Sequence, residues 1–331
     1  MEEFKLIEFH RARDFSRKMN ATFEFIKQNF KSLFRSLLYI AGPPALIGSM
    51  MIGTIAGDLI GLTQNMANNA TNPEAFSDFF SSVTFWAQLM LAMIFLLISG
   101  VVTMATINNY ILLYGEKKTN QIEVSEVWEL VRITFWSYLG SMILFFILFL
   151  VAYILLIIPM AFLMASSPAL SVLIIFLIIF VLFYAAFSFA LTFFIQSYEK
   201  IGFFKAILRS NRLVRGKWWS TFGLIMILSL IVSTISYIFI APWYFITIVD
   251  SLHNTSTGVV KETSTAWEIL TIVFFTLYYL AQFLLASLPN VGIAFQYFNL
   301  VELKESKGLM NQIETLGQKP QEADTRPEES F

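Results

Sequence analysis

This chain of 331 residues contains no cysteine, only two histidines and few charged residues, which make up 14% of the sequence. Without cysteine it can form no disulfide, no thiolate nucleophile and no Cys-ligated metal site. His10 and His253 lie far apart in the sequence, and neither has a second ligand at helical spacing. We therefore expect no histidine metal site, no catalytic triad and no cofactor.

The common catalytic motifs are missing as well. The chain has no Gly-rich phosphate loop, no His-Glu-x-x-His and no Gly-x-Ser-x-Gly, which argues against a nucleotide-driven pump or a metalloprotease. Ionisable residues are almost absent from the apolar runs, and Asp58 is expected at the outer end of a helix rather than at membrane depth. We expect no enzyme, because Asn, Gln and Ser transfer protons poorly without a neighbouring acid or base.

Long apolar runs dominate the rest of the chain, and 57% of its residues are hydrophobic. Each uncharged run meets or exceeds the roughly 20 residues that a spanning helix needs. The runs are 36–57, 79–115, 133–198, 218–249 and 269–301. The run from residue 133 is long enough for two helices, and a turn signal at 165–168 divides it. Because the runs are solid rather than alternating, they predict six transmembrane helices and not barrel strands.

The basic residues are sorted by segment. Of the 22 Lys and Arg residues, only Lys261 falls in a segment that six spans would place on the opposite side from all the others. The positive-inside rule therefore predicts that both termini are cytoplasmic. The N-terminus lacks the apolar stretch of a signal peptide, so the first span is expected to stay in the mature protein. We predict a cytoplasmic amphipathic arm (1–35), a six-span domain (36–303) and a polar, mostly disordered cytoplasmic tail (304–331).

Three segments that precede spans have the pattern of amphipathic helices in the cytoplasmic interface. The apolar residues of the first recur at three- and four-residue steps: Phe15, Met19, Thr22, Ile26, Phe30, Leu33 and Leu37. Lys27, Lys31 and Arg35 form a basic row on the same segment. The second segment precedes the fifth span, with apolar Phe204, Ile207 and Leu208 beside basic Lys205, Arg209 and Arg212. A shorter, more acidic one, 124–130, precedes the third span.

The chain also repeats itself. Residues 130–140 match residues 213–223 at six of eleven positions, and the same shift places Pro159 onto Pro242. Chance in so biased a composition is one explanation, and the matching proline favours the other, duplication of a helical hairpin with its interfacial helix. With the first pair of spans, this predicts an all-α membrane protein of three parallel hairpin repeats.

The basic rows are the first candidate site. Each Lys or Arg near an anionic leaflet contributes about 1 kcal/mol to binding. Anionic lipid headgroups, or a membrane protein partner, are therefore the expected ligands of Lys27, Lys31, Arg35, Arg209, Arg212 and Arg215. The alternative is that these residues only enforce topology.

Two polar residues of the last span, Gln282 and Asn290, are the second candidate site, as the lining of a cavity. Pro289 should break the helix beside Asn290 and free backbone carbonyls, a feature that transporters use to bind substrates or ions. The alternative is hydrogen bonding between packed helices.

Segment 209–219, Arg-Ser-Asn-Arg-Leu-Val-Arg-Gly-Lys-Trp-Trp, leads into the fifth span, and segment 297–309 leaves the sixth. Both resemble the six-helix membrane domain attached to some bacterial glycerophosphodiester phosphodiesterases and found in related stand-alone bacterial membrane proteins. The resemblance covers most of the chain from about Phe15 and implies a location in the bacterial inner membrane. The 28 residues after Leu303 cannot contain the soluble catalytic barrel of that enzyme, so no catalytic residue carries over.

Together these patterns predict a non-enzymatic inner-membrane module that binds lipid or a partner protein. The alternative is a transporter or channel for a small or lipidic molecule, with a cavity between the hairpins. Nucleic acid is not an expected partner.

Overall fold

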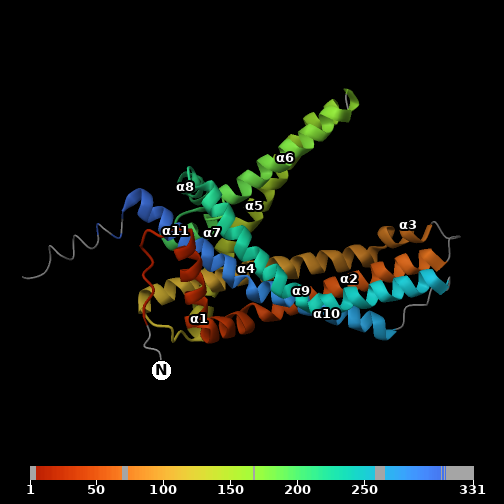
Figure 1. The fold of residues 1–331 in the computed structure, drawn as a ribbon, viewed down its shortest axis with the longest axis horizontal. Coiled ribbons are helices and arrows are strands. Elements are labelled where there is room, and N and C mark those ends of the chain that lie inside the picture. Colours follow the sequence, from red (N-terminus) through yellow and green to blue (C-terminus); the bar gives the residue numbers. More distant parts are fainter. Residues whose placement is uncertain are drawn as a thin grey trace, which may run out of the picture.

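The computed structural model describes residues 5–68, 74–166, 168–257, 265–306, 308 and 310. Every regular element in these residues is an α-helix (Figure 1). The helices are α1 (Phe15–Ile40), α2 (Gly42–Asn68), α3 (Glu74–Ser81), α4 (Val83–Lys117), α5 (Val124–Ser166), α6 (Pro168–Ser188), α7 (Thr192–Glu199), α8 (Phe203–Val214), α9 (Trp218–Thr257), α10 (Thr265–Leu285) and α11 (Ser287–Glu305). Six helical segments are long and apolar enough to cross a membrane. The predicted all-helical class is thereby confirmed, and the six segments have the length and composition that the six predicted spans require.

Three of the six apolar helical segments consist of two helices each. The chain changes direction between α1 and α2 at Ala41 (Figure 1). Pro43 and Pro44 lie in the first turn of α2, where a missing N–H removes no helical hydrogen bond. Pro289 lies likewise in the first turn of α11, after an interruption at Ala286. The helix break expected near Pro289 is therefore present, three residues before the proline.

The break in the fourth span lies between α6 and α7. A helix that ends inside a protein leaves carbonyl groups that need a partner. The Oγ of Ser210, on α8, donates a hydrogen bond of 2.8 Å to the carbonyl of Ser188, the last residue of α6. This bond fixes α8 to the broken span.

The prediction of a separate interfacial helix before the third span is wrong. Residues 124–130 do not form a separate element, because α5 continues from Val124 to Ser166. No glycine, proline or cluster of turn residues lies between Leu130 and Ile133, so nothing in the sequence stops the helix there. The acidic segment is the first part of the third span.

Helix α1 buries a face that overlaps the predicted apolar row in part, because Thr22, Leu33 and Leu37 of that row are buried. Phe15 and Phe30, expected on its apolar face, are 38% and 58% exposed. The buried set is Lys18, Ala21, Thr22, Phe25, Asn29, Leu33, Ser36, Leu37 and Ile40. Polar residues can occupy this face because partners meet them there: the Nζ of Lys18 donates to Ser220 Oγ at 2.7 Å and to Gln296 Oε1 at 2.6 Å.

Helix α8 is a separate element before the fifth span, as expected, and it buries one of the three predicted apolar residues. Phe204 and Leu208 are 65% and 66% exposed. The buried residues are Phe203, Ala206, Ile207, Ser210, Leu213 and Val214. Of the predicted apolar set, only Ile207 faces the protein.

The main core lies where α1, α7, α8 and α11 meet the adjoining ends of α4 and α5; we call this region the basic end, because α1 and α8 carry the basic rows. Buried aromatic side chains fill it. The segment before α1 belongs to it as well, since the ring of Phe9 stacks on that of Phe298 at 4.7 Å and the N–H of Ile7 donates to the hydroxyl of Tyr114 at 3.1 Å.

Consecutive spans pack against one another, α2 on α4, α4 on α5, α5 on α6 and α9 on α10. Helix α2 also packs closely against α10, where a Cβ on Gly53 would lie 2.9 Å from the carbonyl oxygen of Ile272. Small residues permit such close helix contacts in membranes. The α5–α6 pair projects away from the other spans (Figure 1), and many of its apolar side chains are exposed, as lipid-facing surfaces are.

Candidate functional site

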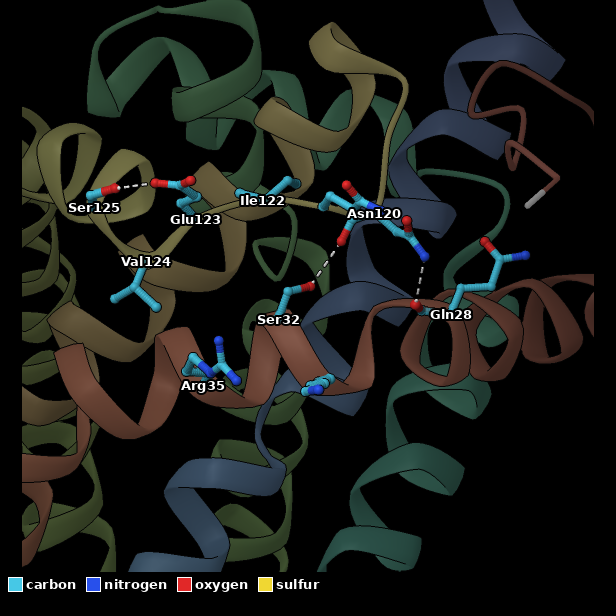
Figure 2. A pocket seen from close by; sticks show the side chains of 10 residues that line it. Gln28, Ser32, Arg35, Asn120, Ile122, Glu123, Val124 and Ser125 are labelled. Carbon is cyan, nitrogen blue, oxygen red and sulfur yellow. Dashed lines mark hydrogen bonds between the residues drawn. The ribbon is translucent and has the colours of Figure 1, made fainter. Parts of the chain in front are cut away.

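A pocket of about 840 Å³ opens at the basic end, between α1 and the segment 120–125 that leads into α5 (Figure 2). Two of the six basic residues predicted as headgroup contacts, Lys31 and Arg35, lie in its wall. We call it the Lys31–Arg35 pocket. Its lining is Gln28, Lys31, Ser32, Arg35, Asn120, Gln121, Ile122, Glu123, Val124 and Ser125.

Hydrogen bonds hold the two walls of the pocket together. The Oγ of Ser32 donates to the carbonyl of Asn120 at 3.1 Å, and the Nδ2 of Asn120 donates to the carbonyl of Gln28 at 3.3 Å (Figure 2). On α1, Lys31 and Arg35 are four residues apart, so they project from the same side of the helix. The pocket therefore has a defined shape and two cations in one wall.

The charges of the pocket are unevenly matched. Within the described residues, Lys31 and Arg35 form neither an ion pair nor a hydrogen bond with another side chain. Glu123 is the carboxylate of the lining and accepts a hydrogen bond of 3.1 Å from Ser125 Oγ. Two cations facing one carboxylate leave an excess of positive charge, which suits an anionic group with several acceptor oxygens, such as a phosphate.

Arg209, on the second basic row, holds three helices together. Its Nε lies 3.0 Å from Glu199 Oε1 at the end of α7, and its Nη2 donates to Glu305 Oε2 at 2.9 Å at the end of α11. The hydrogen-bonded carboxylate of Glu305, together with Glu199, raises the pKa of the guanidinium against the opposing effect of burial. Its charge is thus already balanced, and a contact with a headgroup would compete with two carboxylates.

The remaining basic candidates lie outside the Lys31–Arg35 pocket. The side chains of Arg212 and Arg215 are exposed at the C-terminal end of α8. Their backbone carbonyls accept hydrogen bonds of 2.7 and 2.9 Å from Lys304 Nζ, which satisfies the end of that helix. Lys27 is exposed one turn before Lys31. Lipid contact by these three residues stays a prediction.

The two candidates for a cavity lining bond locally. The Nε2 of Gln282 donates to the hydroxyl of Tyr278 at 3.4 Å, and the Nδ2 of Asn290 donates to the carbonyl of Ala286 at 2.7 Å. Both bonds run between residues four apart along the last span, and Ala286 lies at the helix break. A cavity lined by Gln282 and Asn290 stays a prediction.

Sequence reasoning missed the uncharged part of the site. Gln28 and Ser32 lie on the same segment as the basic row, but a Gln or Ser in a helix carries no signal of its own. Asn120 lies in a short loop 88 residues from Ser32 in the sequence. Only the approach of α1 to that loop brings the three residues together in one pocket.

Comparison with protein-family models, with curated proteins and with solved structures finds no match for this chain. The resemblance to the membrane domain of bacterial glycerophosphodiester phosphodiesterases therefore stays a prediction from segments 209–219 and 297–309.

Proposed function

We propose that this integral membrane protein binds the anionic headgroups of membrane lipids in the Lys31–Arg35 pocket and has no catalytic activity. The observation that carries the proposal is the pair of cations in a pocket of about 840 Å³ whose other lining residues are mostly polar. Pockets of about 300–1,000 Å³ are typical of small-ligand sites. The guanidinium of Arg35 matches two phosphate oxygens at once, and the ammonium of Lys31 adds a point charge.

The proposal places the basic end on the cytoplasmic side of a bacterial inner membrane. The sorting of the Lys and Arg residues supports this orientation. In it, α1 and α8 are amphipathic helices of the cytoplasmic interface, with Phe30 and Phe204 exposed toward lipid. In this orientation the spans taken two by two along the chain form three hairpins of one orientation, as the proposed repeat requires.

The test is the double variant Lys31→Gln/Arg35→Gln. Two cations at about 1 kcal/mol each predict an affinity for phosphatidylglycerol about 30-fold lower than that of the unmodified chain. The measurement is the phosphatidylglycerol retained by protein purified in an uncharged maltoside detergent, counted by native mass spectrometry, with phosphatidylcholine as the reference lipid.

The matched control is Arg212→Gln/Arg215→Gln, which removes two cations of the basic end that lie outside the pocket. It should retain phosphatidylglycerol as the unmodified chain does. Equal retention by all three proteins, or equal loss in both double variants, would contradict the proposal that this pocket is the binding site.

A further inference from the structure

A second cavity lies beside the Lys31–Arg35 pocket. It measures about 620 Å³ and has mainly apolar walls, which we call the Arg132 groove after its charged lining residue. Pro44 comes from the start of α2, Val102 from α4 and Phe135 from α5. Three spans thus form an apolar groove of the size of a ligand site.

The groove and the Lys31–Arg35 pocket are both lined by α1 and by the start of α5. Helix α1 contributes Arg35 to the pocket and Ile40 to the groove, while α5 contributes Ser125 to the pocket and Trp128 to the groove. Five residues along α1 and three along α5 correspond to about 7.5 and 4.5 Å at 1.5 Å per residue. The lining therefore changes from polar and cationic to apolar within about one and a half helical turns.

Arg132 is the charged residue of the groove lining and lies one turn beyond Trp128 on α5. It is exposed, it lines the groove, and it is the last charged residue before the uncharged run 133–198. Trp128 and Trp136 lie one turn to either side on α5 and are 46% and 75% exposed. Tryptophan and basic side chains gather at the level of the lipid headgroups. A soluble anion would use the cations but would leave the apolar groove unfilled.

We infer that the Arg132 groove holds an acyl chain of an anionic glycerophospholipid, with the phosphate against Arg132 and the headgroup in the Lys31–Arg35 pocket. The inference rests on the proposed function and names its ligand as a whole phospholipid rather than a soluble phosphate compound. An acyl chain that moves from the bilayer into the groove exchanges one apolar environment for another. Its binding therefore depends on packing in the groove and on the charge of Arg132.

Two variants test the groove separately from the pocket. Arg132→Gln removes the cation, and Val102→Trp fills the apolar space from α4. We expect Arg132→Gln to retain about fivefold less phosphatidylglycerol, the effect of one charge near the headgroups, and Val102→Trp to lose at least as much. The control is Ile147→Trp, which places the same ring on α5 at a residue that is 47% exposed and outside the groove. The measurement is retained lipid by native mass spectrometry on the full chain.

The outcomes separate the inference from the proposed function. If Arg132→Gln and Val102→Trp both retain phosphatidylglycerol normally while Lys31→Gln/Arg35→Gln loses it, the groove is not a lipid site and the pocket binds headgroups alone. If all three retain it, the proposed function fails too. If Val102→Trp does not fold, the lipid retained by Arg132→Gln, a variant of an exposed residue, decides whether the groove is a lipid site. Binding of sn-glycerol 3-phosphate as tightly as phosphatidylglycerol to the unmodified chain would also overturn the inference, because the acyl chain would then contribute nothing.

Discussion

Replacing Arg209 with glutamine should destabilise the basic end while leaving the Lys31–Arg35 pocket in place. The guanidinium lies between the carboxylates of Glu199 and Glu305, so its loss leaves two like charges at the ends of α7 and α11. The hydroxyl of Tyr297 still donates to Glu199 Oε1 at 2.7 Å, but a neutral hydrogen bond does not balance a carboxylate. The junction of three helices would therefore lose its central cation.

The magnitude follows from how far these side chains are buried. Removing one partner of a fully buried ion pair costs about 3–5 kcal/mol. Here the side chains of Arg209, Glu199 and Glu305 are 18%, 19% and 28% exposed, so water can solvate the carboxylates that Arg209→Gln leaves unpaired, and the loss of stability is smaller. We expect the free energy of unfolding to fall by about 2–3 kcal/mol for Arg209→Gln. Arg209→Lys keeps the charge but loses the bidentate contact with Glu305, so the free energy of unfolding should fall by about 1–2 kcal/mol.

The assay is unfolding in mixed micelles by titration with sodium dodecyl sulfate, followed by tryptophan fluorescence. Arg212→Gln, an exposed arginine on the same helix, is the matched control and should change stability by less than about 0.5 kcal/mol. The opposite outcome is that Arg209→Gln unfolds like the unmodified chain and instead loses phosphatidylglycerol. Arg209 would then be the headgroup contact that the basic pattern suggests, and its ion pairs would contribute nothing to stability.

Two further predictions concern the contacts between helices. Gln296→Leu removes the acceptor that lies 2.6 Å from the buried Lys18 Nζ and should lower the free energy of unfolding by about 2–3 kcal/mol. Adding Lys18→Met to this variant should restore most of the lost free energy. Additive losses in the same titration would show that the two side chains act independently. Gly53→Ala should lower the free energy of unfolding by about 1–3 kcal/mol, because its Cβ would meet the backbone of Ile272 on α10. Gly57→Ala is the control, since no atom lies within 4 Å of its Cβ, and it should be neutral or slightly stabilising. Equal stabilities of the two variants would contradict the close packing of α2 on α10.

The candidate site shows how far sequence patterns reach. Spacing by four residues correctly places Lys31 and Arg35 on one side of a helix, because the helical period is a local property. It cannot tell which cations have a wall opposite them: Lys31 and Arg35 face the loop at Asn120, whereas Arg209 meets Glu305 at a separation of 96 residues. The sequence also contained a signal at Arg132, between two tryptophans at the edge of an uncharged run, but the apolar wall opposite it comes from α4.

The six long apolar helical segments and the break before Pro289 follow from the sequence alone. These properties depend on the length of uncharged runs and on the fixed backbone geometry of proline, which act locally. The tertiary structure alone decided which face of α1 is buried, because Lys18 is tolerated inside only where Gln296 and Ser220 meet it. The tertiary structure also forms the cationic pocket and the apolar groove, because the packing of helices distant in the sequence brings their walls together.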